Sequence, residues 1–224
     1  LVSSELNAFL SGPIHRVLDS PGLDLTLKGT VDLGHATKWV PPPPVPVSGL
    51  VNIDGTIKGP AGHFVTALQV TSSTLAVGRE RQLTLAGSIL ATFESFSGTQ
   101  LAIVPQSGGE IRAGFNVPWG GSSVSQATAT WQALDAQTAL DLANVSPQAI
   151  AAGFDGTGTF EFGEPRRFAI ANRSTGRTKR GHVPISGTIR ATITGDDYRF
   201  DHNHRLPGFD LEGRMAGRIN RADA

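Results

Sequence analysis

Two histidines placed two positions apart are the side chains of this 224-residue sequence best suited to chemistry. In an extended strand, His202 and His204 would lie on one face, with the carboxylate of Asp201 next to them. Imidazole and carboxylate groups bind zinc and related metals, but such a site takes three or four protein ligands. No third histidine lies nearby in the sequence, and the surrounding residues suit a turn between strands. The pair is therefore only a weak candidate for metal ligands, and we expect no cofactor.

Other stretches that resemble ligand-binding motifs are explained better by structure than by chemistry. Gly156-Thr157-Gly158 continues a strand pattern instead of opening a helix, so it does not match a dinucleotide-binding turn. The basic stretch Arg173–His182 could meet phosphate groups, but a solvated loop tip is the simpler interpretation. The absence of cysteine excludes thiolate metal sites, disulfides and a cysteine nucleophile. With no catalytic constellation in view, we expect that the protein is not an enzyme.

The overall composition favours neither nucleic acid nor a membrane-spanning helix as the basis of function. Lysine plus arginine and aspartate plus glutamate both number 19, so the formal net charge is zero and no nucleic-acid partner is expected. No apolar run approaches the roughly 20 residues that span a bilayer. The sequence starts at Leu1 without a charged and then apolar leader. We expect it to be a segment of a longer protein, with any membrane anchor or targeting signal outside it.

The elements that would position side chains are strands. The stretch Val47–Gly59 shows the strand pattern that the rest of the chain repeats. Its odd positions are valine, glycine and isoleucine, and its even positions are mostly polar, which is the period of a strand with one apolar face. A glycine followed by threonine or serine and an apolar residue recurs along the chain. The copies are Gly29-Thr30-Val31, Gly55-Thr56-Ile57, Gly87-Ser88-Ile89, Gly158-Thr159-Phe160 and Gly187-Thr188-Ile189. A repeated unit of this kind indicates a stacked or meandering array.

Four stretches depart from the strand pattern. Ser4–Leu18 predicts one or two helical turns broken by Gly12-Pro13, so residues 1–20 form a short helical lead-in to a single elongated domain at 21–224. Residues 38–46 contain Pro41–Pro44 and predict an extended crossing. Leu134–Ile150 predicts a short helix that ends before Pro147, and Arg173–His182 predicts a polar loop.

About a dozen strands with short connections predict an antiparallel, all-β fold. Its apolar side has to be covered, and a second sheet would make it a β-sandwich. The apolar positions are rich in glycine, alanine and valine, which favours a sheet that curls lengthwise around an apolar groove. A β-sandwich and a β-helix remain as alternatives, although unequal gaps between the glycine motifs disfavour regular rungs.

Five stretches together carry a resemblance to a known family. They are GLVNIDGTIKGPAGHF, FNVPWGG, WQALDAQTAL, GFDGTGTFEFGEPRRF and PISGTIRATITG, in this order between Gly49 and Gly195. The succession of strand pairs, a Gly-Pro step, a meander and an Asp-Leu helical turn resembles the AsmA/TamB-type envelope proteins. The resemblance extends from about Gly22 to the end, with Pro41–Pro44 and Arg173–His182 as departures from it. It implies a β-taco groove that transfers phospholipids between the inner and outer membranes and serves outer-membrane biogenesis. It also implies a location in the periplasm of a diderm bacterium, an inner-membrane anchor outside this segment, and a TamA-like outer-membrane assembly barrel as partner.

On this interpretation the ligands are phospholipid acyl chains, which apolar residues alternating along the strands would line. The predicted lining residues are Leu25, Leu27, Val31, Val51, Ile53, Ile57, Leu85, Ile89, Phe115, Val117, Phe160, Phe162, Ile189, Ile193, Leu211 and Met215. Two other functions stay open. One is an extracellular β-domain that binds or hydrolyses carbohydrate, although Trp119, Trp131 and Tyr198 offer few aromatic platforms for sugars. The other is a structural scaffold of the envelope.

Overall fold

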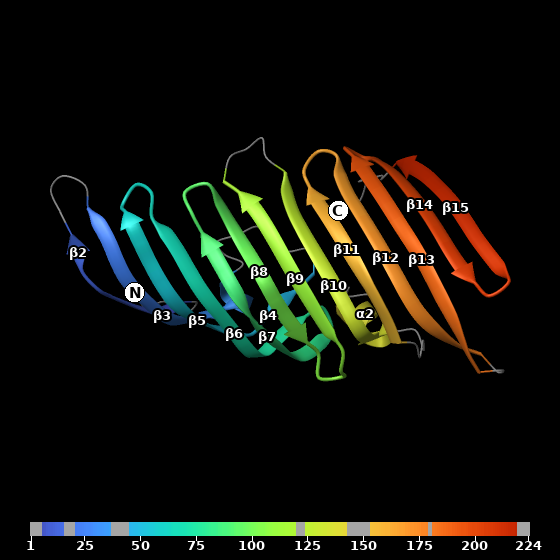
Figure 1. The fold of residues 1–224 in the computed structure, drawn as a ribbon, viewed down its shortest axis with the longest axis horizontal. Coiled ribbons are helices and arrows are strands. Elements are labelled where there is room, and N and C mark those ends of the chain that lie inside the picture. The colour runs from blue at the N-terminus through green and yellow to red at the C-terminus, as the bar shows by residue number, and fades with distance from the viewer. Residues whose placement is uncertain are drawn as a thin grey trace.

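A computed structural model gives the fold and describes residues 6–15, 21–36, 45–119, 124–142, 153–178 and 181–218. These residues form fifteen strands and two short helices (Figure 1). The first strands and helix are β1 (Leu6–Ser11), β2 (Ile14–His15), β3 (Gly22–Asp32), α1 (Leu33–Ala36), β4 (Val47–Ser48) and β5 (Leu50–Pro60). They are followed by β6 (Val65–Val77), β7 (Glu80–Ala91), β8 (Ser95–Val104), β9 (Glu110–Pro118), β10 (Ser125–Asp135) and α2 (Ala136–Leu142). The last strands are β11 (Gly153–Phe162), β12 (Arg166–Thr178), β13 (Gly181–Thr194), β14 (Asp197–Leu206) and β15 (Phe209–Arg218).

All fifteen strands belong to one antiparallel sheet. Its order is β1-β3-β5-β6 and then every strand in sequence to β15, with β2 paired to β3 and β4 paired to β6. In Figure 1 the strands lie side by side along the long axis of the molecule, from β2 and β3 at one end to β15 at the other. Short connections favour antiparallel neighbours, so apart from β2 and β4 the sequence of strands is also their order in space. The prediction of an elongated, all-β antiparallel meander is confirmed, and within the described ranges the sheet stays open and has no second sheet against it.

The sheet has an apolar and a polar face because side chains alternate along each strand and the register keeps that alternation in phase. In β5, Val51 is buried and Ile53 is partly buried, while Asn52 and Asp54 are exposed. The register of β3 and β5 sets Val31 opposite Val51, so apolar residues face apolar residues across the strands. We call the side of Val51 and Ile53 the apolar face, and the opposite side the polar face.

The helical lead-in predicted at residues 1–20 is wrong over residues 6–15, the part of it that the structure describes. Leu6–Ser11 and Ile14–His15 are strands that both pair with β3. Leu6, Ala8 and Leu10 repeat with the period of a strand. Pairing with β3 places these positions on the same side of the sheet as the apolar residues of β3. Ala8 is accordingly buried at 7% exposure.

The predicted polar loop at Arg173–His182 is also wrong, because strands β12 and β13 run into this stretch from both sides. They pair continuously from Arg166 opposite Ile193 to Thr178 opposite Gly181. The backbone N–H and C=O groups of the threonines and arginines here form the hydrogen bonds of the ladder. The stretch contains no alternating apolar residues that would predict a strand. The predicted short helix in Leu134–Ile150 is confirmed at Ala136–Leu142. Residues 143–150 and the proline run Pro41–Pro44 lie outside the described residues.

Among the described residues, three other than glycine take positive φ angles, and all three lie at shifts of the strand register. Gln82 has φ 59°, Gln100 has φ 54° and Ala133 has φ 49°. The register shifts near them, between β6 and β7, between β8 and β9, and between β10 and β11. Each extra residue forms a β-bulge, which increases the local twist of the sheet.

Candidate functional site

A row of paired positions on the apolar face crosses the sheet from β1 to β15. Each member is the direct register partner of the next, so the row is continuous through thirteen strands. Its members are Leu10, Leu27, Gly55, Leu68, Ile89, Gly98, Phe115, Ala127, Phe160, Phe168, Ala191, Phe200 and Met215. No charged or amide side chain interrupts it, which makes this row the most extended apolar feature of the described fold.

All sixteen residues predicted to line a groove lie on the apolar face. They are Leu25, Leu27, Val31, Val51, Ile53, Ile57, Leu85, Ile89, Phe115, Val117, Phe160, Phe162, Ile189, Ile193, Leu211 and Met215. Their exposure differs: Val51 is buried, whereas Phe162, Leu211 and Met215 are 53%, 46% and 58% exposed. The sequence reasoning omitted other members of the face, including Leu68, Phe168 and Phe200, although the same alternation could have found them. The role of these residues in binding lipid stays a prediction.

Large side chains lie over glycines on this face. A Cβ atom added to Gly98 would meet the Phe115 ring, and one added to Gly158 would lie 2.9 Å from the Phe160 ring. Of the glycines in the repeated motifs, three leave room for a neighbouring side chain: Gly87 for Leu101, Gly158 for Phe160 and Gly187 for His204. Gly29 and Gly55 lie against the backbone of the adjacent strand instead. Aromatic rings placed over strand glycines recover packing that the missing side chain would otherwise lose.

Aromatic rings also gather in two groups on the apolar face. The ring centroids of Phe96 and Phe115 are 5.3 Å apart, and those of Phe96 and Trp119 are 6.1 Å apart. In the second group, Phe160 lies 6.5 Å from Phe162 and 6.3 Å from Phe168. These separations fall in the range of favourable ring pairs.

Helix α2 covers one end of the apolar face, near β7 and β10. Asp135 caps it by accepting a hydrogen bond from the backbone N–H of Gln137 at 2.8 Å. The hydroxyls of Thr138 and Ser107 are 2.6 Å apart, which ties the helix to the turn after β8. Around this end, the described core residues Leu75, Leu83 and Leu134 are 4%, 0% and 4% exposed. This end of the face is packed, whereas the opposite end of the strands is more open.

An acidic group lies beside this packed end. Burial raises the pKa of Glu80, and the nearby carboxylates of Asp141 and Asp135 raise it further. The backbone N–H of Arg79 donates a hydrogen bond to the carbonyl of Asp141 at 2.8 Å, so α2 and the start of β7 are held together.

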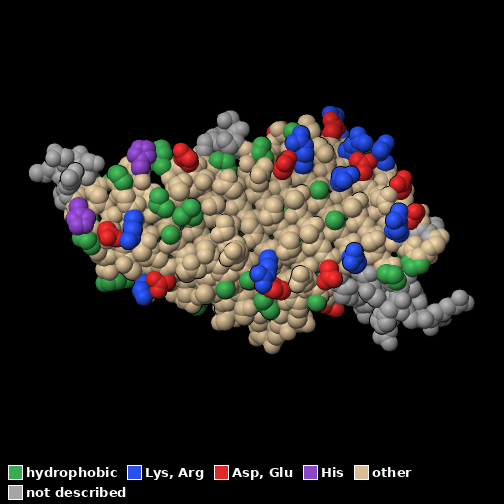
Figure 2. Space-filling model, viewed as in Figure 1, with side chains coloured by type: hydrophobic (Ala, Val, Ile, Leu, Met, Phe, Trp, Pro, Cys, Tyr) green, Lys and Arg blue, Asp and Glu red, His purple; other side chains and the backbone are tan. Residues whose placement is uncertain are grey.

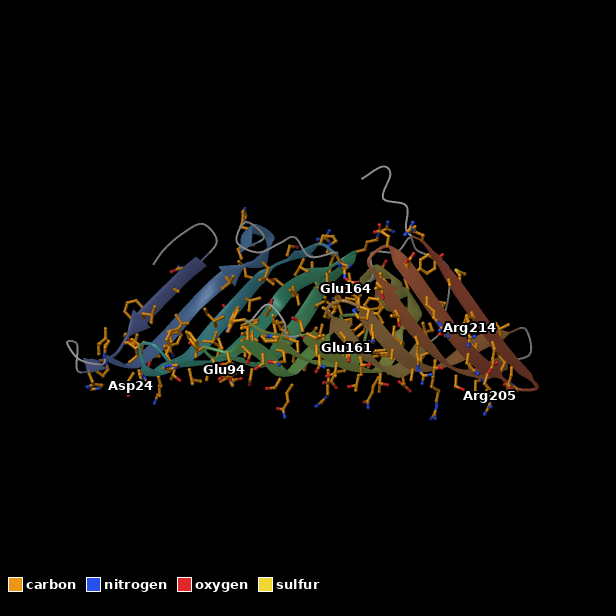
Figure 3. All side chains as sticks on the ribbon, turned by 90° about the horizontal axis from the view of Figure 1, so that it is seen from above. Asp24, Glu94, Glu161, Glu164, Arg205 and Arg214 are labelled. Carbon is orange, nitrogen blue, oxygen red and sulfur yellow. The ribbon has the colours of Figure 1, made fainter. Side chains whose placement is uncertain are left out.

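The polar face carries charges and cross-strand ion pairs. Lys28 of β3 lies 3.1 Å from Asp54 of β5, and Lys58 lies 3.4 Å from Asp24. Figure 2 shows charged side chains over this face, most densely toward β13–β15. In Figure 3, Asp24 and Arg205 lie near opposite ends of the sheet and project to the same side. These pairs are exposed and contribute little stability each, so their main effect is to keep this face wetted.

Asp201 is the centre of the charged group on β14 and β15. Arg214 lies 2.7 Å from one carboxylate oxygen of Asp201, and Arg199 lies 3.1 Å from the other. The hydrogen bond from Arg214 is the main cause that lowers the pKa of Asp201. Asp201 points to the polar face, whereas His202 points to the apolar face, so the predicted carboxylate and imidazole neighbours are separated by the sheet.

The hollows that the described residues line open on the polar face. One of them has a volume of about 920 Å³ and lies over β10–β14. Threonine, asparagine and arginine side chains line it, among them Thr130, Thr157, Thr188, Asn203 and Arg205. It is an open depression of mixed polarity and not a continuation of the apolar row.

Among the described strands, asparagine and histidine side chains enter the apolar face on β12 and β14, whereas serine and threonine also occur on it elsewhere, as at Ser72 and Thr66 of β6. The asparagine and histidines are Asn172, His202 and His204, and the ring centroids of the two histidines are 5.5 Å apart. No group of three or more histidine, cysteine, aspartate or glutamate residues that could hold a metal occurs among the described residues.

No helix among the described residues is long and apolar enough to cross a membrane. In comparisons with protein-family models, curated proteins and solved structures, nothing matches this chain.

Proposed function

We propose that the apolar face binds the acyl chains of phospholipids and shields them from water. The observation that carries this proposal is the uninterrupted apolar row from Leu10 to Met215, on a sheet whose other face is charged. An exposed apolar surface of this extent is a mark of a binding surface. Burying each CH₂ group contributes roughly 0.8 kcal/mol, so acyl chains bind such a face without any polar contact.

The length of the row suits transfer better than storage of one molecule. Neighbouring strands lie roughly 4.8 Å apart, so the twelve intervals of the row extend over roughly 58 Å. The hydrocarbon core of a bilayer is roughly 30 Å thick. A lipid tail therefore covers only part of the row, and successive strands offer it equivalent apolar positions to move along.

On this basis we further propose transfer of phospholipids between the inner and outer membranes of a diderm envelope. The support is the resemblance of five stretches to AsmA/TamB-type proteins, together with a sheet that has the order of an elongated meander. The proposal places the protein in the periplasm and gives it a TamA-like outer-membrane assembly barrel as partner.

A carbohydrate-binding function would use the hollow of about 920 Å³ on the polar face instead. Sugar sites normally include an aromatic platform, and Trp131 is the only aromatic residue along the described lining of this hollow. Its ring, however, lies against the Cβ position of Gly156, which is on the apolar face. This arrangement favours the lipid proposal over the carbohydrate one.

The test compares two glutamates placed one residue apart on β5. Ile57→Glu puts a charge on the apolar face, and Thr56→Glu puts the same charge on the polar face. Each 224-residue chain is purified and mixed with phosphatidylglycerol and phosphatidylethanolamine, and bound lipid is counted by native mass spectrometry. We expect lipid on the wild type and on Thr56→Glu, and at least tenfold less on Ile57→Glu with unchanged far-UV circular dichroism.

Two outcomes would contradict the proposal. If the wild-type chain carries no phospholipid, the apolar face is not a lipid site, and a scaffold role becomes the better explanation. If Ile57→Glu unfolds the chain while Thr56→Glu does not, Ile57 belongs to a closed core, because an open face lets water reach the charge.

A further inference from the structure

Two polar atoms are buried in the apolar face without a hydrogen-bond partner. They are Oδ1 of Asn172 on β12 and Nδ1 of His202 on β14. Both residues belong to the apolar face, since their register partners include Gly156 and Gly187 for Asn172 and Ile189 for His202. Buried polar groups are almost always paired in proteins, so unpaired ones need an explanation.

Rings from the strands beyond its direct neighbours lie on both sides of Asn172. Its two register partners are glycines, Gly156 on β11 and Gly187 on β13, which have no side chains of their own. The Trp131 ring lies over Gly156, where an added Cβ would be 2.6 Å from it. The His204 ring lies over Gly187, where an added Cβ would be 3.0 Å from its Cγ atom. Asn172 thus sits between two rings, each of which lies over a glycine of an adjacent strand.

His202 lies in a similar arrangement, two residues before His204 on β14. Its ring lies over Gly213 of β15 and is 5.9 Å from the ring of Phe200 and 5.5 Å from that of His204. The apolar face therefore contains a defined polar area bounded by aromatic rings, with apolar residues such as Ile170 and Ile189 beside it.

We propose that Asn172 and His202, framed by Trp131 and His204, form a subsite for the hydroxylated head of an amphiphile whose chain lies on the apolar row. This inference rests on the proposed lipid-binding function and adds the position and chemistry of the head. The Oδ1 atom of Asn172 accepts a hydrogen bond, so its partner has to be a donor. A ring nitrogen of histidine donates or accepts according to its tautomer, and a hydroxyl group suits either role.

The spacing of the two side chains calls for more than one hydroxyl. Asn172 and His202 are two strands apart, which is roughly 9–10 Å across the sheet, and their rows differ by two residues along it. A single hydroxyl cannot reach both, whereas a glycerol head carries separate hydroxyls, and a hydrogen bond of about 2.8 Å at each end extends their reach. The apolar row passes this area at Phe200, two residues from His202 along β14, and runs through Phe160 and Phe115 toward β5, which gives the chain a direction away from the head.

The experiment uses the full 224-residue chain and two probes with the same acyl chain. One is monomyristoylglycerol, and the other is its di-O-methyl ether, which keeps the shape but has no hydroxyl donor. Competition between them is read by native mass spectrometry for the wild type, Asn172→Leu and the matched control Asn116→Leu. Asn116 lies on the polar face of β9 and is exposed, so the same chemical change there leaves the subsite intact.

We expect the wild type and Asn116→Leu to prefer the free glycerol by about fivefold to tenfold, the effect of one or two added hydrogen bonds. Asn172→Leu should bind both probes with a preference below twofold, and its far-UV circular dichroism should match the wild type. His202→Phe should lose part of the preference, which gives a second variant at an independent position.

The outcomes separate the inference from the function on which it rests. If the wild type binds both probes equally well, the subsite is wrong and acyl-chain binding stands. If Asn172→Leu and Asn116→Leu keep the same preference, the glycerol is recognised elsewhere and the subsite is again wrong. If neither probe binds, the apolar face is not a lipid site, and both proposals are overturned.

Discussion

Truncating Leu83 tests whether the end of the apolar face near α2 is the main packed core of the sheet. Leu83 is 0% exposed and pairs with Leu75 across β6 and β7, whereas Leu90 on the same strand points to the polar face and is 42% exposed. Leu83→Ala removes buried carbon worth roughly 2.4 kcal/mol at roughly 0.8 kcal/mol per group. A cavity would remain because α2 and its hydrogen bond to Ser107 hold the surroundings in place. We therefore expect a loss of about 3–4 kcal/mol in the free energy of unfolding.

Leu90→Ala is the matched control. It removes the same atoms from a site that is already open to water, so no cavity forms and the loss should be about 1 kcal/mol. Urea denaturation followed by tryptophan fluorescence and by far-UV circular dichroism gives both values. If the two variants lose the same stability, α2 does not enclose a packed core. In that case the residues around Leu83 would close the cavity as readily as residues on the exposed strands.

Two further predictions concern glycine packing and pH. Gly98→Ala should lower the free energy of unfolding by about 1–3 kcal/mol, because its Cβ would meet the Phe115 ring and lie 2.9 Å from Leu101. Gly114→Ala has its nearest neighbours at 3.4 and 3.6 Å and should be neutral or slightly stabilising, so equal losses in urea titrations of the two would refute the packing argument. The pKa of Glu80 is raised by burial and by Asp141 and Asp135, so ionised Glu80 destabilises the fold at neutral pH. This cost disappears as the pH falls toward about 4.3, the pKa of a glutamate in the unfolded chain. Glu80→Gln should therefore be more stable than wild type at pH 7 and no more stable at pH 4, and a pH-independent difference would assign the effect to packing instead.

Side-chain alternation made the two faces predictable from the sequence. In Val47–Gly59, each apolar residue faces the same way, and sequential hairpins carry that choice from strand to strand. The alternation could not decide between helix and strand for the first twenty residues. Leu6, Phe9 and Leu10 fit the period of a helix, whereas Leu6, Ala8 and Leu10 fit that of a strand. Pairing with β3 decides between them, and that contact is not local in sequence.

The bulges were beyond sequence reasoning for a different physical reason. Gln82, Gln100 and Ala133 take φ angles that usually call for glycine or asparagine, so their residue types gave no sign of them. The strand at Arg173–Thr178 was missed because it is polar throughout, and backbone pairing with β13 maintains it. Asn172 was missed as part of a site because the polar stretch around it predicted a loop. Only the register shows that it faces the same side as Ile170.

The order of the strands has a consequence for how the molecule unfolds. Apart from the short strand β4, the extensive contacts between described strands join sheet neighbours, so each hairpin is held by the hairpins beside it. Such a chain behaves as a linear series of coupled units, in which cooperativity fades with distance. Amide exchange should then be slowest near α2, where the sheet is packed, and become faster strand by strand toward β15. A lesion in β14 would open that end alone and leave β5–β10 folded, so this protein could lose or gain a hairpin without rebuilding its interior.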